Sequence, residues 1–154
     1  MQTHRSISPS ASIAVKDMHS DYRKSCLVIT SSMSSMPRLD RFISGLQKAW
    51  KINQEDFDTI RIVLSEALMN AIVHGNKSAS SGIVYIDAFR DDDYYTFSIE
   101  DDGPGFDFEG LDNPTAEENL NKPNGRGIFI MKHLADGIHF SKNGKCLKLL
   151  FNVK

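Results

Sequence analysis

Three polar side chains recur every four residues in the middle of the chain: Glu66, Asn70 and His74. Residues at this spacing share one face of an α-helix, so the three would form a row beside an apolar stripe. A neutral amide oxygen such as that of Asn70 suits Mg²⁺, and a carboxylate such as Glu66 can accept a proton from water or a hydroxyl. The polar flank of an ordinary amphipathic helix would show the same spacing, so this segment alone leaves both interpretations open.

A second group follows an apolar run, in the segment Glu100-Asp101-Asp102-Gly103-Pro104-Gly105-Phe106. The Asp101 carboxylate, at the end of a strand, could accept a hydrogen bond from an exocyclic amine such as that of adenine. Gly103 and Gly105 would let the backbone turn sharply and approach a ligand closely. In isolation, a turn rich in Asp and Gly is the safer interpretation.

A third group is a glycine-containing loop that opens a helix, Asn124-Gly125-Arg126-Gly127-Ile128-Phe129-Ile130-Met131. Free N–H groups at a helix start, beside an Arg, favour a phosphate. The Gly-Lys-Ser/Thr ending of a P-loop is absent, and the loop does not follow a first strand as a dinucleotide fingerprint would. Taken alone, the segment could equally be a helix start with flexible glycines.

The hydrophobic pattern predicts the elements that would position these groups. An apolar face from Leu39 to Trp50 predicts a first helix, and a longer stripe predicts a second helix that stops at Gly75. The full set, in chain order, is a strand over Cys26–Thr30, a helix starting near Ser34–Pro37, a helix over Gln54–His74, strands over Ile83–Phe89 and Tyr94–Ile99, a helix over Gly127–Ala135, and a hairpin of Ile138–Ser141 and Cys146–Asn152 around Asn143-Gly144.

Short turns join the central strands, so most of the sheet should be antiparallel, with the helices on one face. We therefore predict an α+β two-layer sandwich with a mixed, largely antiparallel sheet, formed by residues 23–154 as a single domain. Residues 1–22 are rich in Ser and lack a sustained apolar period, which predicts a mobile tail. Residues 102–124 contain several Gly and Pro without a clear period, which is typical of a functional loop such as a lid.

Composition excludes several classes of protein. Hydrophobic residues make up 40% and charged residues 25% of the chain, as in ordinary globular proteins, and the formal net charge of −2 argues against a large basic face for nucleic acid. No stretch is long enough for a membrane-spanning helix, and the N-terminus lacks the apolar block of a secretory signal. Cys26 and Cys146 have no metal-ligand spacing and are interpreted as reduced thiols, so we expect a cytoplasmic protein.

Together, the three groups, in this order and with a lid between the last two, resemble the GHKL (Bergerat-fold) ATPase superfamily from about Cys26 onward. The resemblance implies ATP and Mg²⁺ as ligands. It implies that Glu66 is the general base, that Asn70 ligates Mg²⁺ and that Asp101 binds the adenine amine. It further implies a base pocket shaped by Gly103 and Gly105, a lid over about 110–124, and phosphates held by Gly125, Arg126 and Gly127.

The remaining cofactor-binding candidates of this resemblance are His74, Phe106 and Ile128. Lys122 and Lys77 are further candidates for phosphate contacts, although ordinary solvent exposure is the simpler interpretation of Lys77. Related proteins often place a Thr near the start of the last strand, where it supports the adenine. Here the segment is Gly144-Lys145-Cys146-Leu147, so that contact is in doubt.

Within the superfamily, the chain is similar to the bacterial anti-sigma-factor serine/threonine-protein kinases. The similarity rests on Glu-Ala-x-x-Asn-Ala-x-x-His-Gly at Glu66–Gly75, Gly-Pro-Gly-Phe-Asp at Gly103–Asp107 and the run Gly125–Met131. It implies phosphorylation of a Ser or Thr on a STAS-domain antagonist, sequestration of a sigma factor, and a homodimer.

Two alternatives remain open beside this hypothesis. In the first, the chain is a non-catalytic binding module in which nucleotide only sets the shape of a partner surface; the presence of Glu66 favours catalysis over it. In the second, the chain is the catalytic domain of a histidine kinase. His4 and His19, the histidines that precede the domain, lie in the unpatterned tail and not on a long amphipathic helix, so this alternative fits poorly.

Overall fold

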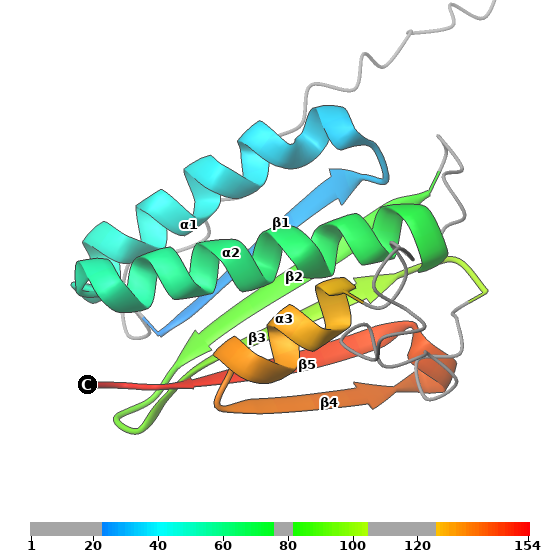
Figure 1. Ribbon diagram of the computed structural model, residues 1–154. Coiled ribbons are helices and arrows are strands. Elements are labelled where there is room, and N and C mark those ends of the chain that lie inside the picture. The colour runs from blue at the N-terminus through cyan, green and yellow to red at the C-terminus, as the bar shows by residue number, and fades with distance from the viewer. Residues whose placement is uncertain (1–22, 76–81, 105–125) are drawn as a thin grey trace, which may run out of the picture.

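Five strands form one sheet in the computed structural model, which describes residues 23–75, 82–104 and 126–154 (Figure 1). Their order across the sheet is β1-β2-β3-β5-β4, and every pair of neighbours is antiparallel. The predictions for residues 1–22 and for most of the lid lie outside the described residues. The strands are β1 (Lys24–Thr30), β2 (Ile83–Arg90), β3 (Tyr94–Asp101), β4 (Gly137–Ser141) and β5 (Cys146–Asn152).

Three α-helices cover one face of the sheet in the described part of the chain: α1 (Met36–Trp50), α2 (Gln54–Asn70) and α3 (Arg126–Leu134) (Figure 1). Alternate residues of each central strand face these helices, because side chains along a strand point to opposite sides of the sheet. The predicted α+β two-layer sandwich is confirmed. The buried residues of the sheet are Val84, Ile86 and Ala88 on β2, Tyr95, Phe97 and Ile99 on β3, and Leu147, Leu149 and Phe151 on β5.

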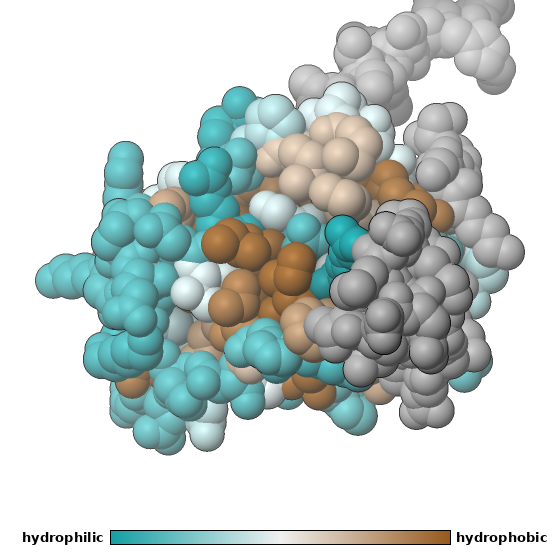
Figure 2. Space-filling model, in the orientation of Figure 1, coloured by the Kyte–Doolittle hydropathy of each residue, from teal (hydrophilic) through white to brown (hydrophobic). Residues whose placement is uncertain are grey.

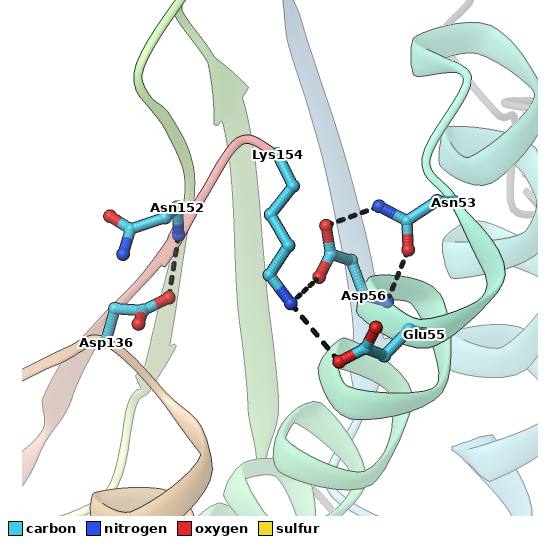
Figure 3. A network of polar contacts seen from close by, with 6 residues as sticks. All are labelled: Asn53, Glu55, Asp56, Asp136, Asn152 and Lys154. Carbon is cyan, nitrogen blue, oxygen red and sulfur yellow. Dashed lines mark hydrogen bonds and ion pairs between the residues drawn. The ribbon is translucent and has the colours of Figure 1, made fainter.

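A polar network fixes the beginning of α2 to the segment after β5 (Figure 3). Asn53 caps the helix: its Oδ1 accepts the N–H of Asp56 at 2.9 Å, and its Nδ2 donates to the Asp56 carboxylate at 2.7 Å. Asp56 also pairs with Lys154, whose Nζ lies 3.0 Å from Asp56 Oδ1, and this bond raises the pKa of the Lys154 ammonium. The network therefore holds α2, the helix that carries Glu66 and Asn70, against the sheet.

Two strand boundaries follow from pairing and turn geometry. β1 begins at Lys24, two residues before the predicted Cys26, because its pairing with β2 extends to Phe89. The predicted hairpin of β4 and β5 is confirmed. Its turn, Lys142–Gly144, has φ angles of 51°, 55° and 81°, a left-handed region that Asn and Gly adopt more readily than other residues.

The end of α2 differs from the prediction. The α-helix ends at Asn70 rather than His74, and the chain continues as one π-helical turn, Ala71–Gly75. The helical segment reaches Gly75, the predicted terminator, but Gly75 has no positive φ and is therefore not a left-handed helix cap. Isolated π-turns occur frequently at functional sites, and this one directly follows a candidate metal ligand.

Candidate functional site

Gly127, near the start of α3, lies against the two candidate residues of α2. A Cβ atom built on Gly127 would lie 2.7 Å from Glu66 Oε2 and 3.4 Å from Asn70 Oδ1. Contacts below 3.0 Å are essentially never made by real Cβ atoms, so only Gly fits here without displacing the Glu66 carboxylate. The structure therefore brings the first and third sequence groups together, with the backbone of α3 close to both polar side chains.

Asn70 leaves part of its hydrogen-bonding capacity unused. Its Nδ2 is buried and has no hydrogen-bond partner among the described residues. A buried donor without a partner costs about 1–3 kcal/mol, so such groups in folded proteins usually have a ligand or an ordered water. A half-turn of the side-chain amide exchanges its two ends, so the same position can present an N–H to a phosphate or an oxygen to a cation.

Gly75, the last residue of the π-helical turn, lies against the carboxylate of Asp101 at the end of β3. A Cβ atom built on Gly75 would lie 2.5 Å from Asp101 Cγ and 2.8 Å from Asp101 Oδ1. The turn and β3 pack directly on each other. The first and second sequence groups therefore also meet, and the approach requires a residue without a side chain.

Asp101 faces the helices because it continues the inward alternation of Tyr95, Phe97 and Ile99 along β3. The residue is only 4% exposed. Its Oδ1 accepts the N–H of Gly103 at 2.9 Å, which leaves Oδ2 as the second acceptor. Burial raises the pKa of the Asp101 carboxyl, and the hydrogen bond from Gly103 opposes that shift. The site thus offers a buried, directional acceptor at one end of α2.

Comparison with known families identifies this arrangement. Residues 29–151 match the model of the histidine kinase-like ATPase domain. The chain belongs to this family. The resemblance to the GHKL superfamily that the three sequence groups carry is therefore confirmed.

Curated relatives of this ATPase domain have the name anti-sigma F factor. One from Halalkalibacterium halodurans is 34% identical over 87 residues, which cover 54% of this chain and 59% of the relative. Others from Bacillus cytotoxicus and Bacillus cereus are each 33% identical over 92 residues, 58% of this chain and 62% of the relative. The match thus spans about three-fifths of the length of these relatives, and it supports the anti-sigma-factor group within the family.

Three further candidate residues lie on the π-helical turn and on α3. His74 is partly buried in the π-helical turn, and Ile128 packs into the core with 5% exposure. Arg126 is exposed at the first position of α3, beside Gly127. The remaining candidates lie outside the described residues: Lys77, Gly105, Phe106, Lys122 and Gly125.

Two residues that support Asp101 were not singled out from the sequence. The carbonyl of Lys145 accepts the Asp101 N–H at 3.0 Å. In this chain, therefore, the segment in which related proteins often place a Thr contributes a backbone carbonyl. Asp102 Oδ1 accepts the N–H of Ile83 at 3.0 Å, which fixes the chain just after Asp101. This bond joins residues 19 positions apart at the ends of neighbouring strands, so no local sequence signal identifies Asp102 as a support of the site.

In the described residues, no group of three or more His, Cys, Asp or Glu side chains is placed to hold a metal ion. No described helix is both long enough and apolar enough to cross a membrane.

Proposed function

We propose that this chain binds ATP with Mg²⁺ and is a serine/threonine-protein kinase of the anti-sigma type. The observation that supports the proposal is the meeting of the three sequence groups: Gly127 lies against Glu66 and Asn70, and Gly75 lies against Asp101. One nucleotide can be held only if three groups share one site: the residue that binds the adenine, the metal ligand and the helix start that binds the phosphates.

In this proposal, the chain's own residues divide the recognition of ATP. Asp101 accepts a hydrogen bond from the adenine amine, and Gly103 holds the Asp101 carboxylate in place through its N–H. The start of α3, with Arg126 and Gly127, faces the phosphates, because unpaired N–H groups at a helix N-terminus attract anions.

The unpaired amide of Asn70 fits a magnesium–phosphate group. A hard cation prefers oxygen ligands and can take its others from phosphates and water, so one neutral amide suffices from this part of the chain. When bound, Mg²⁺ supplies neutralisation of the charge that develops on the phosphates. The narrow space at Gly127 keeps the helix backbone close to the same group.

Glu66 is proposed to activate the attacking hydroxyl. The hydroxyl oxygen of a Ser or Thr forms a bond to the γ-phosphorus while its proton moves to the Glu66 carboxylate. The bond between the γ-phosphorus and the β–γ bridging oxygen breaks, and ADP leaves with that electron pair. Phosphoryl transfer depends mainly on positioning and charge neutralisation; in this proposal Glu66 orients the hydroxyl, and the start of α3 helps to neutralise the phosphates.

The relatives named anti-sigma F factor support a regulatory protein as the partner. We propose that the phosphoryl acceptor is a STAS-domain antagonist, that the chain also sequesters a sigma factor, and that it acts as a homodimer in the cytoplasm.

The proposal is tested by incubating the purified chain with γ-labelled ATP and each STAS-domain protein of the source organism. Label transferred to a Ser or Thr of one of them supports a kinase. Tight ATP binding without transfer to any of them would instead support the non-catalytic binding module.

Replacing Gly75 by Ala should weaken ATP binding by about tenfold or more, because the new methyl group would overlap the Asp101 carboxylate. The overlap should also destabilise the fold by about 1–3 kcal/mol, as overpacking does. Gly45→Ala is the matched control: it lies within α1 with nothing within 4 Å, and should stabilise the protein by about 0.5–1 kcal/mol. ATP titration and chemical denaturation measure both effects. Normal ATP affinity in Gly75→Ala would show that Asp101 does not read the base.

Replacing Gly127 by Ala should slow phosphoryl transfer more than it weakens ATP binding. The new methyl group displaces the end of the flexible Glu66 side chain but only touches Asn70, at 3.4 Å. We expect transfer to fall by about 10²-fold, the lower range for a displaced general base. Single-turnover transfer and ATP titration separate the two quantities. Equal losses of affinity and rate would assign Gly127 to phosphate binding alone.

A further inference from the structure

Exposed apolar side chains follow one line along the outer surface of α2 and its π-helical turn. Ile62 is 49% exposed, Met69 36% and Val73 46%, and we call these three residues the α2 stripe. Residues seven and four apart lie on one side of a helix, and the buried residues of α2 occupy the opposite side. Figure 2 shows apolar residues gathered in the middle of the helical face, over α2 and α3.

Glu66 lies at the border of this stripe. It follows Ile62 by one helical turn and precedes Met69 by three residues, so it is about 6 Å and about 4.5 Å from them along the helix axis. The Glu66 side chain is partly buried, with its carboxylate beside Gly127. Whatever approaches that carboxylate from the outside of the helical layer therefore passes over the α2 stripe.

We propose that the α2 stripe is the docking surface for the protein whose Ser or Thr is phosphorylated; this inference rests on the proposed function. A general base must come within about 2.6–3.2 Å of the hydroxyl that it deprotonates. A folded partner that places a hydroxyl there covers about 800 Å² of this chain, which as a round patch is roughly 30 Å across and far wider than the separation of Glu66 from Ile62 and Met69. The stripe therefore lies inside the footprint.

The surroundings of the stripe fit a protein partner. Exposed charged residues flank it on α2, namely Asp58 and Arg61. An apolar centre with a polar rim is the usual composition of protein interfaces. Tyr85 is similarly exposed at 44%, but it points from β2 to the opposite face of the sheet, away from Glu66.

The test is the double variant Ile62→Gln/Met69→Gln, which removes two apolar side chains and keeps charge and helix propensity. We expect the KM for the STAS-domain substrate to rise about tenfold or more, with kcat and the Kd for ATP unchanged. The matched control is Tyr85→Gln, which should leave all three constants unchanged. The probes are the purified STAS-domain proteins of the source organism, with both binding and label transfer measured.

The outcomes separate docking from catalysis. If the wild type transfers label and the double variant keeps its KM, docking on the stripe is overturned and the kinase stands. If the wild type binds a STAS-domain protein without transfer and the double variant loses that binding, docking is supported and the kinase is overturned. A wild type that neither binds nor transfers overturns both. If the double variant sediments differently from the wild type but keeps its KM, the stripe would instead contact a second copy of this chain, and the proposal would be overturned.

Discussion

Glu66→Gln should bind ATP normally and transfer phosphoryl groups about 10²- to 10⁴-fold more slowly. The substitution keeps the size of the side chain and its place beside Gly127, but a neutral amide cannot take the proton of the attacking hydroxyl. Single-turnover label transfer to the STAS-domain acceptor measures the rate, and ATP titration measures the affinity.

Glu55→Gln is the matched control for this experiment. Glu55 lies on the same helix, its side chain is 81% exposed, and its carboxylate pairs with the Lys154 ammonium at 3.4 Å. It should transfer phosphoryl groups at the wild-type rate. Normal transfer by Glu66→Gln would show that another group takes the proton, and Glu66 would then have a positioning role at most.

Asp101→Asn should weaken ATP binding by about 10- to 1000-fold, because a buried site that loses its matching hydrogen-bond acceptor leaves the ligand's donor unpaired. One Asp101 oxygen already accepts the N–H of Gly103. An amide has a single oxygen, so satisfying Gly103 would turn its NH₂ toward the adenine amine, donor against donor.

The same substitution should not lower the stability of the protein without nucleotide. Burial raises the pKa of the Asp101 carboxyl above its value in the unfolded chain. The stability contributed by such a group is fully present below the unfolded pKa and is lost as the pH rises through the folded pKa. At pH 7 the ionised carboxylate therefore costs stability, so the thermal midpoint of apo Asp101→Asn should equal or exceed that of the wild type. A clearly lower midpoint would mean that Asp101 mainly supports the fold.

Much of the fold follows from local sequence patterns. The alternation Tyr95, Phe97, Ile99 points every second side chain of β3 inward, so its continuation places Asp101 on the buried face. In α2, the four-residue spacing of Glu66 and Asn70 puts them on one side. These are short-range rules, and the strands and helices that obey them have nearly the predicted bounds.

The contacts between elements could not be derived in the same way. The sequence predicts Gly75 as a helix terminator. In the structure its lack of a side chain lets the carboxylate of Asp101, 26 residues further along the chain, pack against it. That contact depends on the π-helical turn after Asn70, and one extra residue in a turn leaves no periodic signal. Gly127 is a similar case, since only the packing of α3 on α2 brings it to Glu66.

The measurement that tests the central claim most directly is a calorimetric titration of ATP with Mg²⁺ into the wild type, Asp101→Asn and Asp102→Asn. Asp102 is the control, because it is exposed and an amide oxygen can still accept the Ile83 N–H. The proposal predicts saturable binding by the wild type, nearly the same affinity for Asp102→Asn, and an affinity at least about tenfold lower for Asp101→Asn. No binding by the wild type, or equal affinity in all three proteins, would contradict a nucleotide site built around Asn70, Asp101 and Gly127.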